Sequence, residues 1–395
     1  MRRVAFLAPE FATENGATGG VGNYVLKMAL ALADRGIEAE VFVPSDQPGV
    51  VAYQGIRVER VARDRSVFRR GAARVLRPLA GPHAEVVIQL ANARRLAAAL
   101  RRRHGERPFQ VVQSSNYHLT GASVERVPGR RHVVRISTSR RLYDDAFGGG
   151  RALTARAVET LDARIMRRAD AAYAPSAFLA DYFRRAYALD VRVVRPPAEL
   201  GSEPARTLPF ALPERYLVHF GSLSARKGTD IVARALATAW RDAPDLRMVW
   251  IGPIADAALA AYRAHWGDRA DQVVALGTLD KALTYGAVQK AVAAILPSRV
   301  DNLPNTVIES LILGVPVIGS DGASIDELVE DGVSGALVPI GDDTALAAAM
   351  VAAWRGTARW LGDGFRTPTA IAEMRPDRAV QRFLDLIGSL DEGPR

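Results

Sequence analysis

The sequence of 395 residues contains no cysteine and only six histidines. The absence of cysteine excludes disulfide bridges, a thiolate zinc site and a cysteine nucleophile, and it fits a reducing, cytoplasmic environment. The histidines are scattered, and no His-Glu-x-x-His segment or close cluster of histidines and acids has the spacing of metal ligands. No P-loop, no Asp-x-Asp at a strand end and no Gly-x-Ser-x-Gly occurs. We therefore expect no metal and no cofactor.

Long apolar runs are also missing. No uninterrupted apolar segment approaches the about 18 residues that a membrane-spanning helix needs. The N-terminus, MRRVAFLAPEF, reaches Pro9 and Glu10 before the core of a signal peptide forms, so residues 4–8 are predicted to be a first buried strand. We expect a cytoplasmic protein that is soluble or peripheral at the inner face of the membrane.

Positive charge is in excess. The net charge is +9, and many arginines lie between Arg57 and Arg107. Such a surface attracts phosphates or an anionic membrane, although an arginine-rich composition alone gives the same count. No zinc-finger spacing, homeodomain-like helix or aromatic RNA-binding strand accompanies the arginines, so no nucleic-acid partner is expected.

Short β-branched runs alternate with Ala/Leu-rich stretches, which is typical of parallel sheets covered by helices on both faces. A Pro/Gly-rich segment divides the alternation into two series. We predict an N-terminal domain at 1–195, a linker at 196–213, a second domain at 214–365 and a helical segment at 366–395. The last segment can pack on either domain, and the N-terminal domain is the proposed partner.

The fold class is therefore predicted to be α/β, with two doubly wound Rossmann-like parallel-sheet domains facing a cleft. The predicted strands of the first domain are RRVAFLAP, EAEVFVPS, QVVQSS, HVVRIST and AAYAPS, and those of the second are RYLVHFGS, RMVWIGP, QVVALG, AAILPS and VPVIGS. Ligands of such sheets bind beyond the carboxyl ends of the strands, so the loops there are the candidate sites.

The first such loop, ATGGVGNYV, opens a helix predicted to begin near Gly22. Gly19 and Gly20 permit a tight turn, and the helix start offers N–H groups to an anion. The spacing does not match the dinucleotide motif Gly-x-Gly-x-x-Gly well, and a plain glycine turn is the alternative.

The second loop, GSLSARKGTD, places Arg226 and Lys227 before a helix predicted to begin near Thr229. Cations at this sheet edge suit a diphosphate, and ordinary solvated charges are the alternative. The third loop, PSRVDNLPNTVIES, places Asp301 and Asn302 in a turn and Pro304 at the first position of a helix.

The amides of Asn305 and Thr306 can bind phosphate at that helix start. Glu309 lies about 7–8 Å along the axis from Pro304, too far to share a proton with Asp301. The next stretch, GSDGASIDELVEDG, is predicted to be a loop, a helix and a turn, with residues 321–324 at the tip.

These motifs, GGVGNYV, GSLSARKG and the segment from Pro297 to Val338, together resemble the retaining glycosyltransferases of the GT-B fold, in the glycogen-synthase-like family four (group 1). The likeness covers most of the chain. It implies a metal-independent transfer of a sugar from a nucleoside diphosphate sugar to a hydroxyl acceptor.

The resemblance also implies roles for residues. Asp301 contacts the donor sugar, Glu309 the ribose, and Lys227 the diphosphate. The donor site as a whole is implied to comprise Gly19, Gly20, Ser222, Arg226, Lys227, Asp301, Asn302, Leu303, Asn305, Thr306 and Glu309.

The chain departs from the family pattern at three positions of the second and third loops. Asp301 replaces the usual Glu, Ser222 stands where an Arg is usual, and Pro304 brings no N–H to the helix start. In the first domain, Ser137 stands where many members carry a catalytic His, and the acceptor contacts are predicted to be Asn116, His118, Arg135 and Thr138. A lipid-linked saccharide, a polysaccharide precursor, a natural product and a small sugar phosphate all fit as acceptor.

Two further readings keep the same fold. One is a non-catalytic GT-B-like binding protein, in which Ser222 and Ser137 mark lost activity. The other is a nucleotide-sugar epimerase. A nicotinamide dehydrogenase is less well supported, because no good dinucleotide fingerprint is present.

Overall fold

The computed structural model describes residues 1–14, 19–64, 73–147, 153–200, 205–206, 208–209 and 211–391. Within these ranges the side chains of 73–84, 144–147 and 153–157 are left undescribed. The chain divides into two compact units, which are described one at a time. Unit 1 comprises Met1–Pro197 and Pro376–Arg395, and unit 2 comprises Ala198–Arg375.

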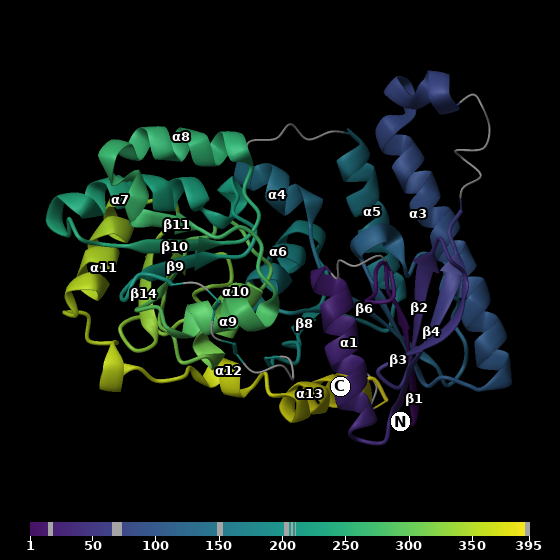
Figure 1. Cartoon of the computed structure of the whole chain (residues 1–395). Helices are drawn as coiled ribbons and strands as arrows, with labels where there is room; N and C mark the ends of the chain where they lie inside the picture. Colours follow the sequence, from purple (N-terminus) through teal and green to yellow (C-terminus); the bar gives the residue numbers. More distant parts are fainter. Residues whose placement is uncertain are drawn as a thin grey trace. The chain divides into compact units, whose positions relative to one another are not determined.

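Unit 1 is built on a sheet with the strand order β3-β4-β2-β1-β5-β6-β7-β8 (Figure 1). Every pairing is parallel except that of β3 with β4. The chain runs outward from β1 on one side and resumes with β5 on the other, so the topological switch point lies between β1 and β5. The strands are β1 (Arg3–Leu7), β2 (Glu38–Ser45), β3 (Gly49–Tyr53), β4 (Ile56–Ala62), β5 (Val111–Ser115), β6 (Arg131–Arg135), β7 (Ala171–Ala174) and β8 (Val191–Val193).

Helices cover both faces of this sheet because its strands are apolar on both sides. On β1, Val4 and Phe6 join the cluster under α1 and α13, while Ala5 and Leu7 face α3. The helices of unit 1 are α1 (Gly20–Ala33), α3 (Ala73–Glu106), α4 (Arg140–Phe147), α5 (Leu153–Arg168), α6 (Ala177–Tyr187) and α13 (Pro376–Gly388), with a 3-10 turn η1 (Tyr117–Leu119).

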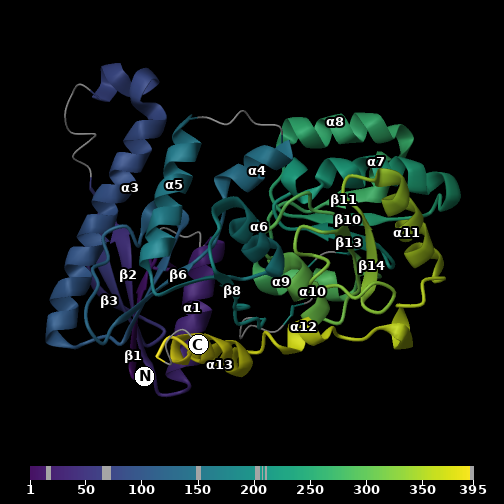
Figure 2. The ribbon, with the colours of Figure 1, turned by 180° about the vertical axis from the view of Figure 1, so that it is seen from behind.

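The helix α13 belongs to unit 1 although it follows unit 2 in the sequence. It lies beside α1 in both views (Figures 1 and 2). Its Phe383 is fully buried and meets the Tyr173 ring edge-on, with the centroids 6.2 Å apart. Arg35, which follows α1, adds a hydrogen bond to Gln381.

Unit 2 contains a parallel sheet with the strand order β11-β10-β9-β12-β13-β14. Its switch point lies between β9 and β12, so the loops after these two strands leave the sheet side by side. The strands are β9 (Leu217–Phe220), β10 (Met248–Ile251), β11 (Val273–Ala275), β12 (Ala294–Leu296), β13 (Val317–Asp321) and β14 (Gly335–Pro339).

One face of the second sheet packs against α7, α8 and α11, and the other against α9, α10 and α12. Figure 2 shows α7 and α11 next to each other. The helices are α7 (Thr229–Asp242), α8 (Asp256–Trp266), α9 (Lys281–Gln289), α10 (Asn305–Ile312), α11 (Asp343–Arg355) and α12 (Thr369–Ala372), with 3-10 turns η2 (Ala225–Lys227), η3 (Gly267–Gln272) and η4 (Gly362–Gly364).

Each of the ten strands predicted from the sequence is present, and the α/β class with two Rossmann-like sheets is confirmed. Three local predictions were wrong. The helix expected to begin at about Gly22 or Asn23 begins at Gly20, and Gly19 precedes it with a φ of −67° instead of forming a turn of positive φ. The helix expected after residue 324 is a series of turns, with short-range bonds such as that from the Leu328 amide to the Ile325 carbonyl. Pro304 is the extended residue before α10, one position earlier than predicted. In the described part of the chain, no helix combines the length and apolarity needed to cross a membrane.

Candidate functional site

The side chains of Lys227 and Asp301 meet at the switch point of unit 2. Lys227 ends η2, in the loop after β9, and Asp301 lies in the loop after β12. The Lys227 ammonium contacts Asp301 Oδ2, and both side chains are largely buried. Asp301 Oδ1 accepts the Asn302 amide at 3.0 Å. The carboxylate therefore has both oxygens engaged, and the Asn302 amide, predicted as a ligand donor, points to Asp301 instead.

A second ion pair joins the same two loops. Arg299 donates to both carboxylate oxygens of Asp230 at 2.6 Å, and it also donates to the carbonyl of Ala225 at 2.6 Å. Burial raises the pKa of Asp230, but the bonds from Arg299 outweigh it and leave the pKa below its usual value. No motif in the sequence marks Arg299, which joins the loop of Lys227 to the loop of Asp301.

Gly228 allows these loops to approach closely. Its φ is +76°, and a Cβ added there would lie 2.1 Å from the carbonyl oxygen of Pro297. No other residue type fits this place without moving the backbone.

The first turn of α10 lies next in the chain. Pro304 precedes it with no side-chain cap, and the turn contains no acid. The amides of Asn305 and Thr306 have no partner inside an α-helix, so they are suited to an anion. Ser222, by contrast, is exposed, and Leu303 packs against the apolar core of unit 2.

The tip after β13 supports the Asp301 loop. Ser324 is fully buried and donates to the carbonyl of Asn302 at 3.0 Å, with a longer contact of 3.3 Å to that of Asp301. Ala323 and Ser324 have φ of +53° and +63°, a conformation that costs non-glycine residues free energy. The hydrogen bonds of Ser324 hold it beneath the loop and help to offset this backbone strain.

Glu309 has a hydrogen-bond partner that no sequence motif marks. The hydroxyl of Tyr285, on α9, donates to Glu309 Oε1 at 3.1 Å. Burial raises the pKa of Tyr285, and the negative charge of Glu309 adds to the shift. Tyr285 occurs within an apolar helical pattern, so only the packing of α9 on α10 reveals its polar contact.

In unit 1, Glu10 lies at the start of α1, where Gly19 and Gly20 were predicted to receive an anion. Glu10 Oε1 accepts the Gly22 amide at 3.3 Å. A Cβ on Gly19 would lie 2.2 Å from the same oxygen. The carboxylate complements the positive helix end, and residues 15–18 of this loop lie outside the described residues.

Four of the predicted first-domain residues form one cluster beyond β5 and β6. The Asn116 side chain donates to the Thr138 carbonyl at 2.6 Å and accepts the Ser137 amide at 2.8 Å. Arg135 donates to Ser137 Oγ at 2.7 Å, and Ser115 Oγ donates to the same oxygen at 3.1 Å. Ser137 therefore receives two hydrogen bonds at the position expected for a catalytic residue.

Arg135 is buried without a carboxylate partner among the described residues. Its guanidinium lies 3.9 Å from the centroid of the Tyr24 ring, and burial lowers its pKa. Cation–π contact offsets part of the cost of burying this charge. His118, the remaining predicted residue, has a φ of +59° and stacks on Tyr117, and burial lowers its pKa.

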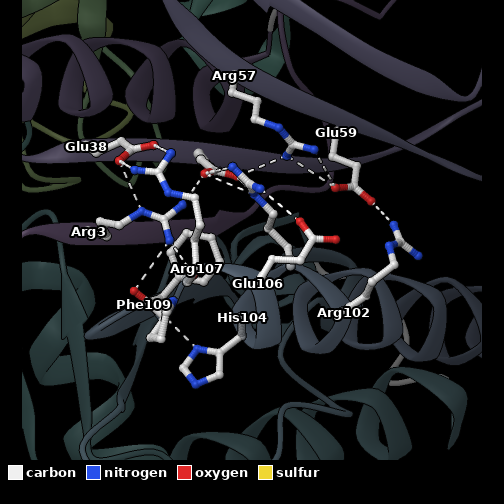
Figure 3. A network of polar contacts seen from close by, with 12 residues as sticks. Arg3, Glu38, Arg57, Glu59, Arg102, His104, Glu106, Arg107 and Phe109 are labelled. Carbon is white, nitrogen blue, oxygen red and sulfur yellow. Dashed lines mark hydrogen bonds and ion pairs between the residues drawn. The ribbon is translucent and has the colours of Figure 1, made fainter.

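Several arginines between Arg57 and Arg107 whose side chains are described form ion pairs (Figure 3). Glu40 is fully buried and contacts Arg3, Arg57 and Arg103. Although burial raises the pKa of Glu40, these arginines bring it below its usual value. Further pairs are Arg57–Glu59, Arg102–Glu59, Arg107–Glu38 and Arg60–Glu14.

The described residues were also compared with the arrangement of a metal site. Within the described ranges, no group of three or more His, Asp or Glu side chains could hold a metal ion.

Family models match both parts of the chain. Residues 214–355 match the model described as Glycosyl transferases group 1, and residues 18–200 match Glycosyltransferase Family 4. Among curated proteins, the D-inositol 3-phosphate glycosyltransferase of Mycolicibacterium smegmatis is 26% identical, over 96% of this chain and 87% of its own length. The protein of the same name from Acidothermus cellulolyticus is 27% identical, over 88% and 82%.

Solved structures share the fold. Sucrose-phosphate synthase from Thermosynechococcus elongatus aligns with a TM-score of 0.72 and 19% identity, covering 100% of both chains. Anabaena HepE in complex with UDP-glucose aligns with a TM-score of 0.69 and 18% identity, covering 98% of this chain and 100% of that one. At these identities, the similarity of both structures to this chain concerns the α/β fold.

Proposed function

Because the chain belongs to the group 1 glycosyltransferases, we propose that it moves a sugar from a nucleoside diphosphate sugar to a hydroxyl acceptor, with retention and without a metal ion. The observation that carries this proposal is the contact between Lys227 and Asp301 at the switch point of the second sheet. The complex of HepE with UDP-glucose supports the donor class.

Breaking the bond between sugar and diphosphate leaves negative charge on the departing phosphates, and that charge must be stabilised. Lys227 has three N–H donors, so it can hold Asp301 and a phosphate oxygen at once. We propose that the amides of Asn305 and Thr306 bind the same diphosphate. Arg226, next to Lys227 in η2, supplies the second charge in place of Ser222.

Asp301 is proposed to bind the donor sugar and Glu309 the ribose. A double displacement would need a free carboxylate at the anomeric carbon. Asp301 is poorly suited to that role, because Lys227 and the Asn302 amide engage both of its oxygens. We therefore propose a front-face reaction, in which the leaving phosphate takes the acceptor proton.

The acceptor is proposed to be a small phosphorylated polyol bound by unit 1. The names of the relatives support this class. Among the arginines whose side chains are described, Arg57, Arg102, Arg103 and Arg107 are paired with Glu38, Glu40 or Glu59 and are less available to a lipid surface. A lipid-linked acceptor at an anionic membrane is the alternative, and pelleting with anionic liposomes at low and high salt distinguishes the two.

A thermal-shift panel of UDP-, GDP-, ADP- and dTDP-sugars tests the donor, because a ligand of the folded state raises the Tm. The sugar that binds is then offered with D-inositol 3-phosphate, and the anomeric configuration of the product is read by NMR. We expect Lys227→Ala to lower the transfer rate about 100-fold. The control, Lys290→Ala on the exposed end of α9, should transfer normally.

Asp301→Ala tests the sugar-binding role. We expect a lower transfer rate and a higher donor KM. An unchanged transfer rate and an unchanged donor KM would show that Asp301 does not bind the sugar. A wild-type product of inverted anomeric configuration would contradict retention.

A further inference from the structure

We propose that Tyr285 is a positioning residue that fixes Glu309 and thereby makes the site selective for ribonucleotides over 2′-deoxyribonucleotides. This inference rests on the proposed role of Glu309 as the ribose ligand. It adds a residue from a helix that contributes none of the predicted site.

The contact is directional. The Tyr285 hydroxyl lies 3.1 Å from Glu309 Oε1, and a carboxylate can only accept, so the tyrosine is the donor. The raised pKa of Tyr285 keeps its proton in place throughout the physiological range. The hydroxyl of Tyr285 therefore acts as the donor at neutral pH.

The tyrosine itself is held rigidly. Its side chain is only 4% exposed, and α9 packs on α10 through Ala287, Val288, Val307 and Ile308. Tyr216, just before β9, bonds the same helix at another point, where its hydroxyl donates to the carbonyl of Ala287 at 2.6 Å. A rigid donor selects one orientation of the half-buried Glu309 carboxylate before any ligand arrives.

An oriented carboxylate suits a vicinal diol. The two oxygens of a carboxylate offer about four acceptor sites, so Glu309 can hold the Tyr285 hydroxyl and also accept from both hydroxyls of a ribose. A 2′-deoxyribose offers one hydroxyl and leaves part of the carboxylate without its ligand hydrogen bond. Without Tyr285 the Glu309 carboxylate must be ordered when the ligand binds. The free-energy cost of this ordering weakens the binding of the ribonucleotide.

Isothermal titration calorimetry with the diphosphates of uridine, guanosine and adenosine, and with their 2′-deoxy counterparts, tests this inference. The proteins compared are wild type, Tyr285→Phe and the matched control Tyr216→Phe, which removes another buried hydroxyl that bonds α9. We expect Tyr285→Phe to raise the ribonucleotide Kd about tenfold. The 2′-deoxynucleotide Kd should change less than about twofold, so that the selectivity ratio falls towards one.

Kinetics give a second readout. Tyr285→Phe should raise the donor KM while kcat at saturating donor stays nearly unchanged, as expected for lost binding alone. In Glu309→Gln the additional change Tyr285→Phe should have little effect, because the tyrosine acts through the glutamate. Tyr216→Phe should leave both affinities and their ratio unchanged.

The outcomes are separable. If wild type binds ribonucleotides and Tyr285→Phe keeps the same ratio, the positioning role is wrong and the proposed function stands. If Tyr285→Phe weakens both nucleotides equally together with a lower Tm, the tyrosine is merely structural. If wild type binds no nucleoside diphosphate, the proposed function itself fails.

Discussion

Asp162, on α5, is a buried carboxyl group with an unusual environment. Its Oδ1 has no hydrogen-bond partner among the described residues, and Glu159 lies close by on the same helix. Burial, with the charge of Glu159 as a second cause, raises the pKa of Asp162 well above its usual value. The folded protein therefore keeps a proton that the unfolded chain releases.

This proton makes stability depend on pH. Between the unfolded and the raised folded pKa, the folded state binds more protons, so the free energy of unfolding falls as pH rises. We expect Asp162→Asn to raise it by about 1–2 kcal/mol at pH 8, because the neutral amide needs no proton. Urea unfolding followed by circular dichroism at pH 5 and pH 8 measures the effect.

The gain should be smaller at pH 5, because this pH lies closer to the unfolded pKa, below which the gain disappears. Asp190→Asn, at an exposed position of the same unit, is the control and should change nothing at either pH. An equal gain of Asp162→Asn at both pH values would show that the buried charge is not the cause.

Individual residues were predictable where a motif marked them. Lys227 and Asp301 could be identified because each follows a strand, but their contact across 74 positions needed the sheet order. Tyr285 could not be identified, because its side chain fits the apolar stripe of its helix. Arg299 likewise looked like an ordinary loop charge.

Among the elements, the loop containing η2 depends on one glycine. Gly228 combines a positive φ with a carbonyl oxygen at 2.1 Å from the position of a Cβ. Gly314, after α10, has the same φ of +76° but open space around it. Alanine variants at the two positions therefore distinguish the cost of backbone strain, present at both, from that of a steric clash, present only at Gly228.

We expect Gly228→Ala to displace the loop that bears Lys227. Gly314→Ala should cost only the about 1–2 kcal/mol of a left-handed alanine. Gly228→Ala should cost more and weaken donor binding at least tenfold, because Pro297 and Lys227 must both move. Thermal unfolding and calorimetric titration of both variants provide the comparison, and equal losses in the two variants would contradict the clash.

Element prediction failed where charges took part in sheet pairing. The strands β3 and β4 were not predicted. In β4, Arg57, Glu59 and Arg60 resemble a charged loop, and β3 is the uncharged edge strand that pairs with it. In the structure Glu59 pairs with Arg57 and with Arg102 of α3 (Figure 3). Arg57 also pairs with the buried Glu40, and Arg60 pairs with Glu14. The edge strands β8 and β14 were not predicted either.

On the scale of the whole molecule, the two units carry different spectroscopic probes. All five tryptophans, Trp240, Trp250, Trp266, Trp354 and Trp360, belong to unit 2. Tryptophan fluorescence therefore reports on unit 2, while circular dichroism reports on both units.

This division allows a test of α13. We expect Phe383→Ala to destabilise unit 1 by about 3–5 kcal/mol, because it leaves a cavity beside Tyr173 and α1. The circular-dichroism transition should gain an early phase while the tryptophan fluorescence transition keeps its midpoint. Arg378→Ala, exposed on the same helix, is the control, and a shifted fluorescence midpoint in Phe383→Ala would show that the helix stabilises unit 2 instead.

The return of α13 to unit 1 sets an order for folding during synthesis. A ribosome releases residues 198–375 as one continuous piece, so unit 2 can complete its core while the chain is still growing. Unit 1 begins first but finishes last, since the apolar surface around Tyr173 and α1 waits for Phe383 to emerge. Translation of the intervening 178 residues, at about 5–20 residues per second, leaves that surface uncovered for roughly ten seconds or more, an interval in which it is a target for chaperones.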